Sequence, residues 1–159
     1  MTKPQRVAAG QIHLRAADGG DLEYCAALYL HGMDAAIQEL KLDRDLQRAK
    51  FHQQWAADEA SIIIREGVAV GWLQMRIEGN SVFLAQLFVE PACQRRGIGT
   101  HILKRIIDEA AGAGRDVTLG VVRTNPALRL YERLGFRITH ADARKFYMRR
   151  EAGTGPSSD

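Results

Sequence analysis

This sequence of 159 residues contains only two cysteines, Cys25 and Cys93, which lie far apart in the chain. They form no C-x-x-C pair and give little basis for a disulfide framework. The sequence also lacks an apolar run of about eighteen residues and a signal-peptide pattern, because its first ten residues are mostly polar. These absences predict a cytoplasmic protein with no membrane partner.

Motifs for metal binding and for nucleophilic hydrolysis are absent as well. The five histidines are scattered and form neither an H-E-x-x-H motif nor a Cys/His cluster, so we expect no metal. No G-x-S-x-G nucleophile elbow is present, and Cys93 has no partner base that the sequence defines.

The charge balance leaves the partner open. The chain has 22 Lys and Arg against 19 Asp and Glu, a formal net charge of +3, and a pI of about 9.1. Such a balance permits an anionic partner without requiring one. A hydrophobic fraction of 46% is ordinary for a globular protein of this length. We expect one domain over residues 11–150, with flexible tails at 1–10 and 151–159.

Apolar periodicity predicts alternating strands and helices that form an α+β domain with a mixed sheet. Tight turns are predicted at Glu66-Gly67 and Gly79-Asn80, because both pairs suit hairpin geometry. In chain order we expect a strand at 12–17, a helix at 21–33, a helical segment at 34–55, three strands within 61–91, a helix at 98–114, a strand at 116–122, a helix at 126–134 and two strands within 136–150.

The segment QRRGIGT, Gln94 to Thr100, lies between a predicted strand and a predicted helix. The first turn of a helix has unpaired N–H groups and a partial positive charge, which together favour a phosphate. Gly97 and Gly99 would let the backbone approach a ligand closely, and Arg95 and Arg96 would add charge. The same residues could also form only a solvated turn.

Spacing excludes two known phosphate loops. A P-loop requires a lysine directly after its second glycine, but Gly99 is followed by Thr100 and His101. A dinucleotide-binding loop requires a third glycine at the position of Ile102.

Gln94 to Gly99 instead fit the pattern [QR]-x-x-G-x-[GA], preceded by LFVEP. Downstream, TNPALRLYERLGF contains Asn125, a tyrosine six residues later and a terminal Gly-Phe. Together these motifs resemble the coenzyme A pyrophosphate loop and the second motif of the GNAT superfamily of N-acetyltransferases, over nearly the whole chain. The resemblance implies the fold of that family, a mixed and mostly antiparallel central sheet flanked by helices.

The resemblance also implies an N-acetyltransferase that moves the acetyl group of acetyl-CoA to a primary amine by direct attack in a ternary complex. Tyr131 would be the general acid for the leaving thiolate, and a backbone N–H near Val89 would stabilise the oxyanion. The residues that would bind the cofactor are Leu87, Phe88, Val89, Gln94, Arg95, Arg96, Gly97, Ile98, Gly99, Thr100, Asn125 and Tyr131.

Simpler interpretations stay open beside these roles. Tyr131 could fill the core, and Asn125 is in the first place a helix N-cap. The domain could bind or sense an acyl-CoA without catalysis. The segment 144–150 is typical of an edge strand with charged ends, so we expect no nucleic-acid partner. A homodimer is compatible with the resemblance.

The proton acceptor and the amine are not defined by the sequence. Phe83 stands where several family members have a glutamate, which leaves Glu90, a residue of the first helical pair or water. Four acids in the segment 34–55 would suit a cationic amine, although a solvated helix face explains them as well: Asp34, Glu39, Asp43 and Asp45. Small molecules and protein amines both stay open as acceptors.

Overall fold

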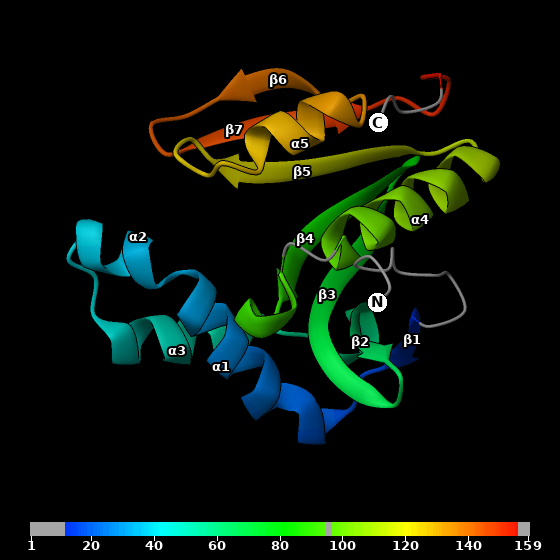
Figure 1. The fold of residues 1–159 in the computed structure, drawn as a ribbon. Helices are drawn as coiled ribbons and strands as arrows, with labels where there is room; N and C mark the ends of the chain where they lie inside the picture. Colours follow the sequence, from blue (N-terminus) through cyan, green and yellow to red (C-terminus); the bar gives the residue numbers. More distant parts are fainter. Residues whose placement is uncertain (1–11, 95–96, 156–159) are drawn as a thin grey trace, which may run out of the picture. The chain divides into compact units, whose positions relative to one another are not determined.

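The computed structural model describes residues 12–94 and 97–155 (Figure 1). Its strands are β1 (Ile12–Ala16), β2 (Ala60–Arg65), β3 (Val68–Glu78), β4 (Ser81–Val89), β5 (Asp116–Val122), β6 (Arg137–Ala141) and β7 (Lys145–Arg150). Its α-helices are α1 (Leu22–Gly32), α2 (Asp34–Glu39), α3 (Arg44–Gln54), α4 (Ile98–Gly112) and α5 (Leu128–Arg133). Short 3₁₀ turns precede α1, β2 and α4.

The strands form a seven-stranded mixed sheet in the order β1-β2-β3-β4-β5-β7-β6. β4 and β5 pair in parallel, whereas β1 with β2, β2 with β3, β5 with β7 and β6 with β7 pair antiparallel. The predicted fold class is therefore confirmed. Both predicted hairpin turns are present, with positive φ at Glu66, Gly67 and Gly79.

Two predicted helices have different bounds in the structure. The segment 34–55 contains two helices, because Lys41 has a φ of 52° and the Asp43 side chain caps α3 by accepting from Asp45 N at 2.9 Å. The helix predicted from residue 126 begins at Leu128 instead. A turn at Asn125 precedes it, in which the asparagine Oδ1 accepts from Ala127 N at 2.9 Å.

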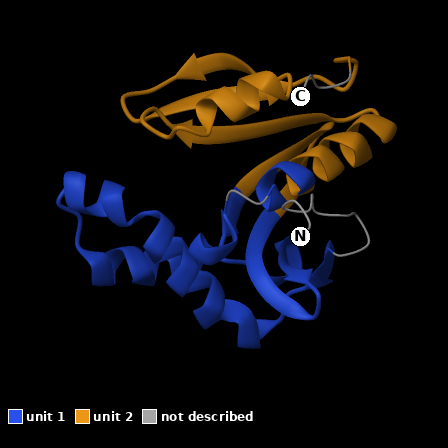
Figure 2. Ribbon diagram, viewed as in Figure 1, with its two compact units in different colours: residues 1–74, 86–101 blue, residues 75–85, 102–159 orange. Residues whose placement is uncertain are grey.

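The chain divides into two compact units, residues 1–74 with 86–101 and residues 75–85 with 102–159 (Figure 2). In the first unit, four aromatic rings on four elements form a cluster. Phe51 lies 4.7 Å from Tyr29 and 5.6 Å from Trp72, and Phe88 lies 5.7 Å from Trp72, measured between ring centroids. This cluster fixes α1, α3, β3 and β4 within that unit.

The core of the second unit is built on the apolar face of α4, as the helical spacing predicted. Ile102, Ile106 and Ala110 are at most 4% exposed. β5, β7 and the segment after α5 contribute further buried side chains: Val117, Leu119, Val121, Leu134, Phe136 and Met148.

Residues 151–155 follow β7 and are hydrogen-bonded to the second unit. The buried Arg150 donates from Nε to Leu134 O at 2.7 Å and from Nη2 to Gly155 O at 2.6 Å. Ala152 N donates to the Asp116 carboxylate at 2.9 Å. Two residues of the predicted tail, Ala152 and Gly155, thus make hydrogen bonds to the second unit, and residues 156–159 lie outside the described residues.

Within residues 12–94 and 97–155, no helix is both long enough and apolar enough to span a membrane. The same residues contain no group of three or more His, Cys, Asp or Glu side chains that could hold a metal ion. Both cysteines are free. Burial raises the pKa of Cys25 to about 12, so its thiol stays protonated and behaves as an apolar core group.

Candidate functional site

The predicted phosphate loop lies between the end of β4 and the start of α4. Gly97 has a φ of 80°, a conformation that residues with a Cβ rarely adopt, although a Cβ built there would meet no atom within 4 Å. The glycine is therefore required by the backbone conformation and leaves open space beside the loop. His101 N donates to Gly97 O at 2.9 Å and closes the first turn of α4.

The first turn of α4 presents main-chain donors. The N–H groups of Ile98, Gly99 and Thr100 have no partner within their own helix, because the first residues of a helix have no preceding carbonyl to bond. Ile98 is 1% exposed and anchors this end of the helix in the core. These donors and the positive end of the helix dipole suit an anionic ligand.

The beginning of the loop is fixed by hydrogen bonds. Glu90 N donates to Val70 O at 2.8 Å, and Cys93 N donates to Glu90 O at 2.8 Å. The side chain of Gln94 returns to the strand end, with its Nε2 donating to Val89 O at 2.9 Å. The side-chain amide of Gln94 is therefore used in a hydrogen bond within the loop, so the group of Gln94 that we consider for ligand binding is its main-chain N–H. Arg95 and Arg96 lie outside the described residues.

A contact that the sequence did not predict joins the loop to α1. The Tyr24 hydroxyl donates to Glu90 Oε2 at 2.7 Å. Burial, and next the hydrogen bond to Glu90, raise the pKa of Tyr24, so the phenol stays protonated and remains a donor. Glu90, which the sequence left as one candidate for the base, thus accepts a hydrogen bond from a half-buried phenol. No sequence pattern signals a pair separated by 66 positions.

Phe88 and Val89, two of the three predicted cofactor residues of β4, have different side-chain surroundings. The Phe88 ring belongs to the aromatic cluster and lies so close to Gly32 that a Cβ there would be 2.7 Å from it. Val89 lies beside the start of α4, because its Cγ2 is 3.9 Å from the position of a Cβ on Gly99. The side chain of Phe88 therefore packs within the first unit.

Asn125 and Tyr131 lie in the second unit, on the turn before α5 and on α5 itself. The Tyr131 ring packs edge-on against Phe136, with the ring centroids 5.9 Å apart. Burial raises the pKa of Tyr131, and its hydroxyl has no hydrogen-bond partner among the described residues. Gly135, at a φ of 97°, ends the helix, and Phe136 N donates back to Tyr131 O at 3.0 Å. The Tyr131 ring thus packs against Phe136, while its hydroxyl has no acceptor among the described residues.

Phe83 occupies the position where a base was sought, and its ring has a partner. The Arg76 guanidinium lies over it, 5.3 Å from the ring centroid. This cation–π contact is a structural use of the side chain. It offers no group that could take a proton.

Two of the four acids in the segment 34–55 have structural partners. Asp34 forms an ion pair with Arg44 at 3.0 Å and accepts from Gln38, and Asp43 caps α3. Their charges are partly compensated by these contacts. The negative charge that the sequence offered to a cationic amine is therefore smaller than the count of acids implied.

A family model, a curated protein and a solved structure are each similar to this chain over more than half of its length. The sequence model described as the acetyltransferase (GNAT) family matches residues 27–136. L-amino acid N-acyltransferase MnaT of Escherichia coli (strain K12) is 30% identical over 139 residues, which cover 80% of this chain and 81% of that protein. The crystal structure of PaiA N-acetyltransferase from Thermoplasma acidophilum in complex with coenzyme A has a TM-score of 0.64 at 17% identity, and covers 88% of this chain and 98% of that one.

A human relative matches over a shorter stretch. Cysteine-rich protein 2-binding protein of Homo sapiens is 36% identical over 70 residues. These residues are 44% of this chain and 9% of that protein, so the chain corresponds to less than a tenth of that relative. The region shared with it is a fraction of a much longer polypeptide.

Proposed function

The chain belongs to the acetyltransferase (GNAT) family, and from this premise we propose that it is an acetyl-CoA-dependent N-acetyltransferase that acts on a primary amine. The observation that carries the proposal is the family match over residues 27–136, which includes both the loop before α4 and the motif around α5. The positive φ of Gly97 supports it, because a glycine in that conformation has no Cβ and lets a ligand approach the main chain before α4 closely.

In this proposal the main chain holds most of the cofactor. The N–H groups from Gln94 to Thr100 bind the pyrophosphate, and Arg95 and Arg96 contribute positive charge. The main chain of Leu87, Phe88 and Val89 pairs with the amides of the pantetheine arm, as a peptide adds to the edge of a sheet. Asn125 and Tyr131 complete the set of cofactor residues.

The proposed reaction is a direct transfer in a ternary complex. The lone pair of the neutral amine attacks the thioester carbonyl carbon, and a backbone N–H near Val89 stabilises the oxyanion. The C–S bond then breaks and its electron pair leaves on sulfur. Tyr131 donates its proton to that sulfur, the nitrogen releases one proton to water, and the Tyr131 phenolate regains a proton from water, so the products are the N-acetylated amine and coenzyme A.

The proton of the amine leaves to water in this proposal. Phe83 cannot accept it, and Glu90 already accepts a hydrogen bond from Tyr24. An ammonium group with a pKa of about 10 is only slightly deprotonated at neutral pH, so the rate depends on the fraction of neutral amine.

For the acceptor we propose the α-amino group of a free amino acid. The name of MnaT specifies L-amino acids for that protein, and the alignment covers four fifths of this chain. The partial neutralisation of Asp34 by Arg44 also suits an acceptor that carries its own carboxylate better than it suits a polycation.

Thiol release tests this function. The full chain is mixed with acetyl-CoA and each member of a panel of amino acids, polyamines, aminoglycosides and peptide N-termini, and free coenzyme A is titrated. We expect release that depends on an amino acid. Binding of acetyl-CoA without turnover on any amine would instead assign the chain as an acyl-CoA-binding domain.

A further inference from the structure

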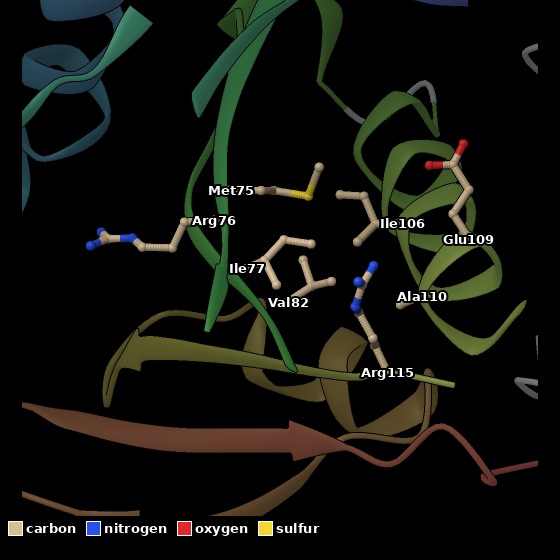
Figure 3. Close-up of a pocket in the computed structure, with 8 residues that line it drawn as sticks. All are labelled: Met75, Arg76, Ile77, Val82, Ile106, Glu109, Ala110 and Arg115. Carbon is tan, nitrogen blue, oxygen red and sulfur yellow. The ribbon is translucent and has the colours of Figure 1, made fainter. Parts of the chain in front are cut away.

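The second unit contains a pocket of about 290 Å³ that the family motifs do not explain (Figure 3). Met75 and Ile77 of β3, Val82 of β4, and Ile106 and Ala110 of α4 form its apolar wall. Ile106 and Ala110 are each 4% exposed, whereas Ile77 is 57% exposed. The base of the pocket is therefore formed by core residues, and its other side is open to solvent.

Three charged side chains also line the pocket, and two of them have partners. Arg76 lies over the Phe83 ring and pairs with Glu78 at 3.8 Å. Glu109 accepts from Arg105 Nε at 3.4 Å. In Figure 3 both side chains extend away from the centre of the pocket. The charges of Arg76 and Glu109 are therefore already paired with neighbouring side chains.

Arg115 differs from the other two. It follows α4 at the start of β5, and its guanidinium extends toward Val82, Ile106 and Ala110 (Figure 3). Its side chain has no hydrogen bond or ion pair with any described residue. Arg115 as a whole is half-buried, and its guanidinium is a charged donor beside apolar walls with no acceptor among the described residues, so an anion in the pocket would find an unpaired cation there.

We propose that this pocket binds a small monocarboxylate with an apolar body. The planar fork of a guanidinium matches a carboxylate in two parallel hydrogen bonds. The apolar walls would remove the rest of the ligand from water. At a share of about 30 Å³ for one water-sized group, the volume holds about ten non-hydrogen atoms. Short alkyl acids and N-acylated apolar amino acids both have this chemistry.

The test is an NMR titration of the ¹⁵N-labelled full chain. Sodium octanoate and N-acetyl-L-leucine are added as probes in separate titrations. We expect at least one probe to give saturable shifts at Val82, Ile106, Ala110 and the Arg115 Nε–H, with a Kd of about 1 mM or below. Octylamine and octanol, which lack the carboxylate, should bind at least about tenfold more weakly. The probe that binds identifies which of the two sources fits.

Matched variants locate the interaction on Arg115. Arg115→Gln should weaken binding of the carboxylate about tenfold or more, and Arg115→Lys should restore part of it. Arg76→Gln is the control, because Arg76 lines the same pocket but its guanidinium points away from the centre. The Kd of the Arg76→Gln variant for the carboxylate should stay within about threefold of the wild-type value. If Arg115→Gln does not fold, the comparison of octanoate with octylamine on the wild-type chain decides.

The proposal is overturned by three results. The first is no saturable shift with either carboxylate, and the second is equal binding of octylamine. The third is unchanged binding by a folded Arg115→Gln variant. None of these results bears on the acetyltransferase proposal, because the pocket shares no residue with the proposed cofactor set.

Discussion

At the scale of single residues, the proposed chemistry depends most on Tyr131. A general acid must hold its proton at working pH and must have a hydroxyl free to donate it. Burial raises the pKa of Tyr131 above its ordinary value, and its hydroxyl has no partner among the described residues. Both conditions are met by a residue that also packs on Phe136.

Tyr131→Phe removes the proton while keeping the ring that packs on Phe136. We predict a loss of about 10²-fold in kcat with little change in the Kd for acetyl-CoA, as stopped-assay kinetics and calorimetry would measure. Tyr147→Phe, on β7, is the control and should keep its activity. A Tyr131→Phe variant with wild-type kcat at saturating substrates would reject the general-acid role.

The pH dependence of the proposed reaction follows from two pKa values, that of the amine and that of Tyr131. The amine reacts when it is deprotonated, so kcat/KM should rise about tenfold per pH unit up to the pKa of the amine. Tyr131 is active while protonated, and because its pKa is raised from 10.0, the falling limb should appear only above about pH 10. A decline that begins near neutral pH would show that some other group supplies the proton.

At the scale of structural elements, we propose that the junction of β4 and α4 binds the cofactor. Its features are the left-handed Gly97, the donors of the first turn of α4, and the hydrogen bond from Tyr24 on α1 to Glu90. Each can be changed by one substitution with a matched control elsewhere.

Gly97→Val should abolish the thermal stabilisation by acetyl-CoA. The variant forces a β-branched residue into a left-handed conformation, at about 1–2 kcal/mol, and puts a side chain into the open space beside the loop. Gly114→Val is the control, because Gly114 has a φ of 70° and equally open surroundings at the other end of α4. Gly114→Val should lose stability but keep its response to acetyl-CoA. A preserved response in Gly97→Val would exclude the loop as the pyrophosphate site.

Tyr24→Phe should loosen the start of the loop. We predict that the KM for acetyl-CoA rises severalfold, to at most about tenfold, while kcat stays unchanged, because the lost hydrogen bond to a charged acceptor positions the loop and takes no part in the reaction. Tyr29→Phe on the same helix serves as the comparison and should leave KM unchanged. A fall in kcat at constant KM would contradict a positioning role.

The elements were largely predictable from periodicity, and their junctions were not. The turn at Glu66-Gly67 and the buried face of α4 carry strong local signals, and the structure has both. The break after α2 depends on one positive φ at Lys41, which no local pattern demanded. The Tyr24–Glu90 pair arises only when α1 lies against the end of β4, so packing decides it.

The candidate site shows the same division. The glycine pattern indicated the loop, because φ angles and helix starts are local properties. The inward turn of the Gln94 side chain and the stacking of Phe83 under Arg76 depend on neighbours that the motif does not specify. The position of Arg115 at the pocket could not be predicted for the same reason, since an arginine is ordinarily solvated and the sequence around it gives no other signal.

At the scale of the whole molecule, the chain passes between its two compact units within β3, within β4 and within α4. Continuous elements of this kind predict cooperative unfolding of the domain expected over residues 11–150. Scanning calorimetry should therefore give one transition whose calorimetric and van't Hoff enthalpies agree. Two separable transitions would show that the units fold independently.

The central claim is that this chain catalyses acetyl transfer from acetyl-CoA to the nitrogen of an amine. The most direct measurement is the stoichiometry of both products in one reaction with a free amino acid, with coenzyme A determined as thiol and the acetylated amine by mass spectrometry. We predict one N-acetylated amino acid for each coenzyme A released. Binding of acetyl-CoA with no product on any amine, or release of thiol with free acetate and no acetylated amine, would contradict the account.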